Sequence, residues 1–174
     1  MPDLWAAIAR AASEESPLWA DCLRADGGRD RAAVFSPLAE ERFALGLETI
    51  YEGYLVHYGT SRLFAPADPD LALLLGDYLY AHGLVHVAAA HDVAAVTDLS
   101  ELISLSSQLR AEGAEGDGAL WAATAALLGR GGLDEPRAAL RIRGDAAALE
   151  EAARAAAGDA AVERALAAHA GRLG

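Results

Sequence analysis

Two histidines one helical turn apart are the residues of this chain whose spacing most directly suggests chemistry. His82 and His86 lie in the apolar stretch LALLLGDYLYAHGLVHVA, residues 71–88. Side chains four residues apart share one face of a helix, so both imidazoles could bind one metal ion. Such sites need further ligands, and no Asp, Glu or Cys lies beside the pair at a helical spacing. The sequence therefore favours a hydrogen-bonding ridge of Tyr78, His82 and His86, and we expect no metal and no cofactor.

Asp77 is a carboxylate in the middle of the same apolar stretch, directly after Gly76. A glycine at this place would allow a neighbouring helix to approach closely. A buried carboxylate without a partner is costly, so we expect Asp77 to be buried and hydrogen-bonded to that neighbour. Mg²⁺ needs several oxygen ligands, and no second carboxylate accompanies Asp77. A structural or interface hydrogen bond is therefore the expected role.

An aromatic stripe precedes this stretch. Tyr51, Tyr54 and Tyr58 fall at helical spacing, a pattern that usually marks a core or an interface. Gly46 and Gly53, seven residues apart on the same segment, indicate close helix packing. The serines of the chain lack the G-x-S-x-G context of a hydrolase nucleophile, so no nucleophile–base pair is visible.

Length and composition predict one all-α domain over residues 1–174. Hydrophobic residues make up 53% of the 174, and Ala and Leu dominate them. The net charge of −12 argues against nucleic acid and anionic lipid as partners. Charges interrupt the N-terminus where a signal peptide would be apolar, and Asp77 with two histidines would be costly inside a bilayer. We expect a cytoplasmic protein without a membrane span, in which residues 71–88 form a buried helix.

Apolar periodicity and helix-breaking residues divide this domain into three parts. We expect N-terminal helices and a loop in residues 1–35, core helices in 36–112 and Ala-rich C-terminal helices in 113–174, with an amphipathic cover from Asp145 onward. Ser36 and Pro37 should open a long helix, with Glu40 closing a capping box. Asp68 should cap another. The expected helices are 2–12, a short one after Pro17, 36–58, 69–90, 93–112, 119–128, 136–142, 145–157 and 159–173.

Residues 71–112 carry a resemblance to a known family. GDYLYA followed by HDVAAVTDLSELISLSSQLRAEG resembles the trans-prenyl diphosphate synthases, in which an LxGDYLLA helix precedes a short turn and an AVRLLAEAVAELAEGE helix. Asp92 matches the aspartate of that turn, and Ala95 and Val96 match the AV pair. The similarity covers about 40 residues well and implies a helical bundle that resembles a shortened isoprenoid synthase fold.

The residues that carry the family's chemistry are missing. Synthases bind Mg²⁺ and a diphosphate through two Asp-Asp-x-x-Asp motifs, the first of which follows a histidine. His57 matches that histidine, but Tyr58, Gly59 and Arg62 stand at the three aspartate positions. The later helix offers only an Asp-Glu pair at residues 134–135 for the second motif. The resemblance thus implies that the chain alone does not catalyse the classical reaction.

Some synthases of this family are heterodimers whose small subunit has lost the aspartate motifs. We therefore predict a non-catalytic small or regulatory subunit that pairs with an active polyprenyl diphosphate synthase in isoprenoid biosynthesis, or with itself. Gln108 stands where the family has a Glu. The residues expected to line a cavity or an interface are Tyr54, His57, Tyr58, Asp77, Tyr78, His82, His86 and Gln108.

Two alternatives stay open. One is a helical binding module that keeps an apolar cavity for an isoprenoid or another lipid-like ligand. The other is a residual Mg²⁺-dependent prenyltransferase that uses relocated acids such as Asp68, Asp70 and Asp77.

Overall fold

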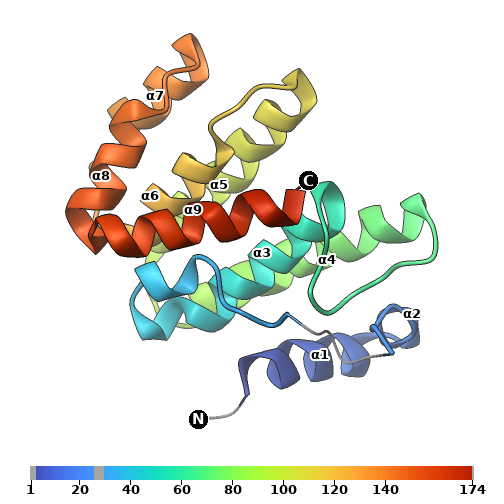
Figure 1. Cartoon of the computed structure of the whole chain (residues 1–174). Helices are drawn as coiled ribbons and strands as arrows, with labels where there is room; N and C mark the ends of the chain where they lie inside the picture. The colour runs from blue at the N-terminus through green and yellow to red at the C-terminus, as the bar shows by residue number, and fades with distance from the viewer. Residues whose placement is uncertain (1–2, 26–29, 174) are drawn as a thin grey trace.

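The chain folds into helices joined by short loops, as the computed structural model shows for residues 3–25 and 30–173 (Figure 1). In these residues there is no strand, and only an isolated bridge joins Leu23 to Phe64. The all-α class expected from the sequence is therefore confirmed. The helices are α1 (Leu4–Glu15), α2 (Pro17–Asp21), α3 (Ala44–Tyr58), α4 (Pro69–Ala88), α5 (Val93–Glu112), α6 (Asp117–Ala126), α7 (Asp134–Arg143), α8 (Ala147–Ala157) and α9 (Asp159–Leu173), with 3₁₀ turns η1 (Ser36–Leu38) and η2 (Glu41–Phe43).

Local capping signals set the starts of α4 and α5. The Asp68 carboxylate accepts a hydrogen bond from the amide of Leu71 at 2.8 Å, and Pro69 occupies the first turn. Asp92 caps α5 in the same way. Gly113 ends α5 in the left-handed conformation with φ of 64°. The expected helix 93–112 is confirmed, as is the start of the helix at residue 69.

The expected helix 36–58 is wrong in its first part. Ser36–Leu38 and Glu41–Phe43 form separate 3₁₀ turns, and α3 begins only at Ala44. The carboxylate of Glu48 accepts hydrogen bonds from the backbone amides of Val34 and Ser36. These contacts hold the segment against α3, so it cannot continue as a helix. Glu40 closes no capping box and forms surface ion pairs with arginines instead.

Glycines bring α3 and α4 into backbone contact. A Cβ built on Gly83 would lie 2.7 Å from the carbonyl oxygen of Gly46. Two helical turns further along α3, a Cβ built on Gly53 would lie 2.9 Å from the carbonyl oxygen of Gly76. Atoms at these separations would overlap, so only glycine fits. The close packing predicted from Gly46 and Gly53 is confirmed, and it defines which side of α4 faces inward.

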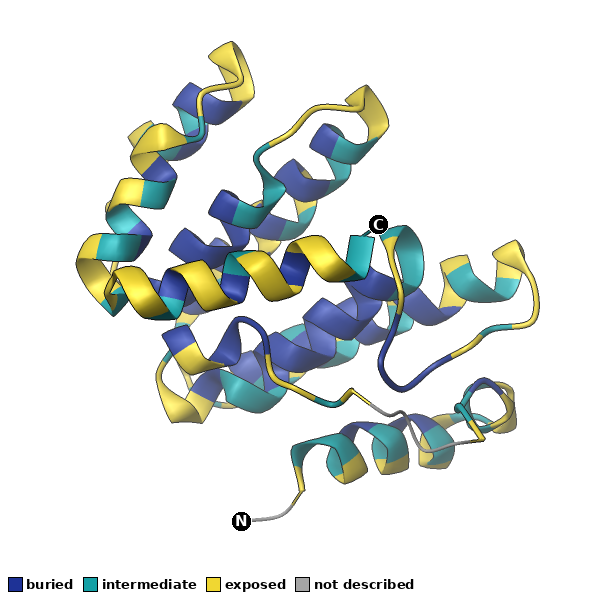
Figure 2. Cartoon of the chain, viewed as in Figure 1, coloured by how far each residue is buried: buried dark blue, intermediate teal, exposed yellow. Residues whose placement is uncertain are grey.

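The remaining helices cover the α3–α4 pair on two sides. α1 and α2 lie along one side of it, where Ile8 and Ala12 pack with Leu75 and Leu79 (Figures 1 and 2). On the other side, α5 to α9 enclose the larger core, and α9 crosses α3 and α6. Helices α8 and α9 are buried along one stripe and exposed elsewhere (Figure 2). They form the amphipathic cover that the Ala-rich sequence predicts.

Candidate functional site

Helix α4 buries only one of its sides. Of its most apolar 18 residues, 28% are buried, so the expectation of a buried helix is wrong. The inward side contacts α3, α5 and α1, and the opposite side stays exposed along the whole length. We call that exposed side the α4 face. It consists of Asp70, Leu73, Leu74, Asp77, Ala81, Val85 and Ala88.

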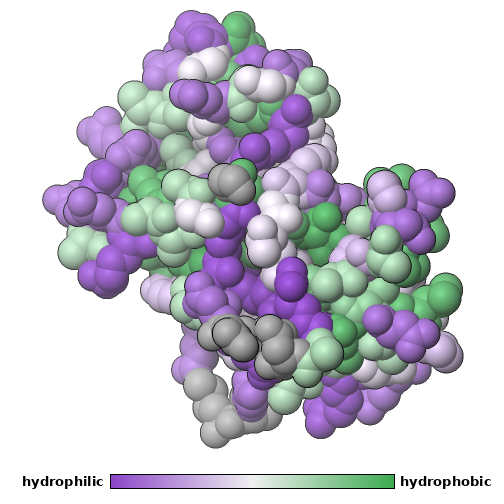
Figure 3. Space-filling view, turned by 45° about the vertical axis from the view of Figure 1, so that its right-hand side comes forward, coloured by the Kyte–Doolittle hydropathy of each residue, from purple (hydrophilic) through white to green (hydrophobic). Residues whose placement is uncertain are grey.

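The α4 face is mainly apolar. Leu73, Leu74 and Val85 are 56%, 57% and 65% exposed, and Val93 at the start of α5 is 79% exposed. Figure 3 brings forward the end of α4 that lies near α2. On that part of the surface, hydrophobic residues gather among hydrophilic ones. Single exposed apolar residues are ordinary, whereas several on one side of a helix are a feature of interaction surfaces. The α4 face is the candidate interaction surface.

Asp77 lies on this face and is exposed rather than buried. Its side chain is 67% exposed, and its Oδ1 lies 3.3 Å from Nε2 of His57, which is itself almost buried. Gly76 leaves room for the His57 ring, because a Cβ there would overlap with it. The expected partner on a neighbouring helix is therefore present, but its position does not bury the carboxylate. Burial lowers the pKa of His57 and outweighs the opposing effect of Asp77.

Tyr78, His82 and His86 form the ridge that the sequence predicts. Nε2 of His82 lies 3.1 Å from Nε2 of His86, and the Tyr78 ring stacks on His82 with centroids 5.3 Å apart. The Trp19 ring of α2 stacks on the Tyr78 ring, with centroids 5.7 Å apart. The Tyr78 hydroxyl donates a hydrogen bond to the carbonyl oxygen of Ala11 in α1. The ridge thus joins α4 to α1 and α2. Burial and the neighbouring His82 both lower the pKa of His86.

The tyrosine stripe of α3 belongs to the core. Tyr51 and Tyr54 are fully buried and pack against the Trp121 ring at centroid distances of 5.0 and 5.4 Å. Tyr58 lies at the end of the stripe, with its ring 5.1 Å from that of Tyr54. These rings fill the interior along α3. An apolar cavity for a lipid-like ligand, as in the binding-module alternative, would have to lie in the same place. Gln108 lies apart from them on α5 and donates to Glu112 at 3.0 Å.

Arg62, at the third aspartate position of the family motif, is buried in an ion-pair cluster. Its guanidinium lies 2.7 Å from Glu48 and 2.5 Å from Glu52, and all three side chains are inaccessible to solvent. Ser61 donates a further hydrogen bond to Glu52. The cluster fastens the loop after α3 to the middle of that helix. The signal in the sequence was the pair of glutamates at i and i+4 on an otherwise apolar helix, which sequence reasoning missed.

A second buried cluster, also missed, surrounds Asp117 at the start of α6. The carboxylate accepts hydrogen bonds from Tyr54, from Arg110 at 2.5 Å and from Nε2 of His169 at 3.2 Å. The other nitrogen of His169 lies 2.8 Å from the Tyr51 hydroxyl. Burial raises the pKa of Asp117, but the bonds from His169 and Tyr54 and the Arg110 charge outweigh it, so the net pKa lies below its ordinary range. The cluster fastens α9 to α3 and α6.

The acids considered for a relocated metal site do not converge. Asp68 caps α4 at its exposed start, Asp70 follows on the surface, and Asp77 pairs with His57 about two turns further on. Asp134 and Glu135 lie at the exposed start of α7. In residues 3–25 and 30–173, no three His, Cys, Asp or Glu side chains are grouped closely enough to hold a metal ion.

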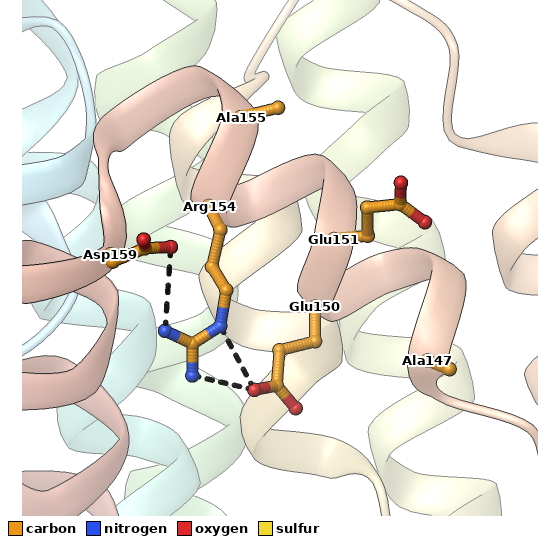
Figure 4. Close-up of a pocket in the computed structure, with 6 residues that line it drawn as sticks. All are labelled: Ala147, Glu150, Glu151, Arg154, Ala155 and Asp159. Atoms are coloured by element: carbon orange, nitrogen blue, oxygen red, sulfur yellow. Dashed lines mark hydrogen bonds and ion pairs between the residues drawn. The ribbon is translucent and has the colours of Figure 1, made fainter.

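A surface hollow on α8 offers no chemistry beyond an exposed ion pair. Arg154 lies between Glu150 at 2.7 Å and Asp159 at 3.7 Å, and the other side chains around the hollow point away from this group (Figure 4). Charged pairs of this kind on an open surface contribute little energy. The hollow therefore carries no functional argument.

Comparison with known proteins gives no family assignment. No protein-family model, no curated protein and no solved structure matches the chain. Within the described part of the chain, α4 is the one helix that is long and apolar enough to cross a membrane, by length and composition only. The link to the prenyl diphosphate synthases thus remains a prediction from the sequence.

Proposed function

We propose that this protein is a non-catalytic, prenyl-synthase-like helical subunit that acts by pairing with another protein through the α4 face. The observation that carries the proposal is the apolar, exposed side of the helix that contains GDYLYA. The sequence resemblance makes an active polyprenyl diphosphate synthase the expected partner, with a second copy of the chain as the other candidate. Its role would be to support or adjust the product length of that partner in isoprenoid biosynthesis.

The three positions that replace the first aspartate motif support a role without catalysis. Tyr58 packs on the aromatic core, Gly59 ends α3 beside the last turn of α9, and Arg62 is fully committed to buried glutamates. The aspartate motif binds Mg²⁺ through carboxylates, and none of these three side chains supplies one. At the positions that would carry the first aspartate motif of the resembling family, this chain has contacts that stabilise the fold, which supports the proposal.

The energetics require a partner that covers more than α4. Full burial of Leu73, Leu74 and Val85, each already partly covered, would contribute about 1–2 kcal/mol apiece. Association costs at least about 4 kcal/mol, and a stable interface buries about 800 Å² on each side. The free energy gained by burying these three side chains alone would hardly exceed the cost of association. A stable partner must therefore also cover neighbouring exposed residues such as Val93 at the start of α5.

Co-expression with a polyprenyl diphosphate synthase encoded beside this chain tests the proposal. We expect one complex on a sizing column and a change in the chain length of the prenyl product. Leu74→Glu and Val85→Glu should abolish the complex, because each places a charge in the apolar interface. Ile142→Glu is the matched control, since Ile142 is 76% exposed on α7, away from the α4 face.

The outcomes separate the candidates. A complex that forms only with the synthase supports the heteromeric role, and a dimer of the isolated chain that Leu74→Glu dissociates supports pairing of two copies. Elution as a monomer in both preparations would overturn the proposal. A complex that resists Leu74→Glu and Val85→Glu would place the interface elsewhere and would equally refute the α4 face.

A further inference from the structure

The two histidines of the ridge are arranged as a pair of ligands. Their Nε2 atoms face one another at 3.1 Å, with the rings nearly perpendicular and their centroids 4.5 Å apart. Two imidazole nitrogens bound to one ion at 2.0–2.1 Å lie about 2.9 Å apart at cis positions of a square plane and about 3.3 Å apart on a tetrahedron. The observed separation lies between these values, so an ion could bind once the two rings turn to direct both Nε2 lone pairs at it, with little change in the distance between the nitrogens.

Neighbouring side chains hold the His82 ring of the pair in place. Tyr78 stacks on the His82 ring, Trp19 stacks on Tyr78, and the Tyr78 hydroxyl is tied to α1. A ligand that is fixed before binding loses less conformational entropy when the ion arrives. In the empty pair one Nε2–H donates to the other Nε2. Binding needs only a shift of that proton to Nδ1 of the same ring, with no net proton release.

The position of the pair leaves room for other ligands. Both histidines are half-buried and border the exposed residues Ala81 and Val85 of α4. No third His, Cys, Asp or Glu of the described ranges joins them, so the remaining coordination positions are open to water or to a second molecule. Imidazole ligands select Cu²⁺, Ni²⁺ and Zn²⁺ over Mg²⁺ and Ca²⁺, and Cu²⁺ binds most tightly.

We propose that His82 and His86 form a two-imidazole binding site for a borderline divalent cation, with open coordination positions toward solvent. Spacing in the sequence alone argued against a metal because a third protein ligand is missing. The geometry changes that judgement, because the two Nε2 atoms lie at the separation that a shared ion requires. The site borders the α4 face, but its metal binding can be tested on the isolated chain, without a partner bound there.

Titration of the tag-free chain with Cu²⁺ tests the site by calorimetry and by electron paramagnetic resonance. We expect about one Cu²⁺ per chain with nitrogen hyperfine coupling, and an affinity at least about tenfold weaker in His82→Ala and in His86→Ala, because each loses the chelating second ligand. Alanine suits an α-helix, so circular dichroism should show both variants folded. Mg²⁺ should not compete, because it prefers oxygen ligands.

His91→Asn supplies the matched control. His91 is exposed just beyond the end of α4 and has a positive φ of 56°, which asparagine tolerates. This variant should bind Cu²⁺ as the wild type does. Equal affinity in wild type and His86→Ala, or a loss of binding in His91→Asn instead, would overturn the assignment. Failure of the wild type to bind Cu²⁺ saturably would do the same.

Discussion

Replacement of Gly83 by alanine measures how closely α3 and α4 must pack. The added Cβ would lie 2.7 Å from the carbonyl oxygen of Gly46, 2.5 Å from Cγ1 of Ile50 and 3.0 Å from its amide nitrogen. Ordinary contact begins at 3.4 Å, so the two backbones would have to separate by about 0.7 Å, since backbone atoms cannot rotate away as a side chain can.

Two opposing energies decide the outcome. Overpacking of a tight core costs about 1–3 kcal/mol, whereas alanine gains about 0.5–1 kcal/mol over glycine inside a helix. We expect a net loss of about 1–2 kcal/mol in the free energy of unfolding, measured by urea denaturation. At about 2–4 °C per kcal/mol for a chain of this size, the melting temperature should fall by several degrees.

Gly171→Ala is the matched control, because Gly171 is exposed in α9 and a Cβ there would meet nothing within 4 Å. The same substitution should be neutral or slightly stabilising at this position. Gly53→Ala, with its nearest backbone contact at 2.9 Å, should lie between the two. A Gly83→Ala variant as stable as the wild type, with Gly171→Ala behaving as expected, would refute the backbone contact between α3 and α4.

Two further predictions concern the buried charges. Arg62→Met should lower the free energy of unfolding, measured by urea denaturation, by about 3–5 kcal/mol, because it leaves Glu48 and Glu52 buried without a cation. Arg154→Met at an exposed ion pair is the control and should lower it by less than about 1 kcal/mol. Equal losses in the two variants would contradict this prediction. The depressed pKa of Asp117 stabilises the fold fully above its unfolded value of about 3.9 and progressively less as the pH falls below it. Asp117→Asn should therefore be less stable than the wild type at pH 7, with a gap that narrows between about pH 4 and pH 2; a gap independent of pH would refute the linkage.

Helix positions could be predicted where the determining residues lie within the helix itself. Asp68 followed by Pro69 starts α4, Asp92 starts α5, and Gly113 ends it, because each acts on backbone groups one turn away. The start of α3 could not be predicted in this way. The Glu48 carboxylate, 12 residues after Ser36, accepts a hydrogen bond from the Ser36 amide. This contact forms only in the folded chain, and it overrides the local signal of Ser36 and Pro37 for the start of a helix.

The sequence singled out Asp77 and the neighbouring ridge but not the apolar residues of the α4 face. The ridge of Tyr78, His82 and His86 follows from helical spacing alone. The exposure of Asp77 does not, because α4 is apolar on nearly every side and its periodicity indicates no inward face. Buried pairs such as Arg62 with Glu48 join segments that are distant in the sequence, so local sequence patterns do not predict the contact.

The sequence by itself determined that this chain is helical, where most of its helices begin and end, and that the first aspartate motif of the resembling family is absent. Only the tertiary structure decided which side of α4 remains exposed and which charged groups are neutralised inside. The physical reason is that capping and periodicity act over one or two turns, whereas burial depends on all the elements that pack together. The contact of Gly46 with Gly83 turns the apolar residues Leu74 and Val85 outward, and the proposed pairing depends on that orientation.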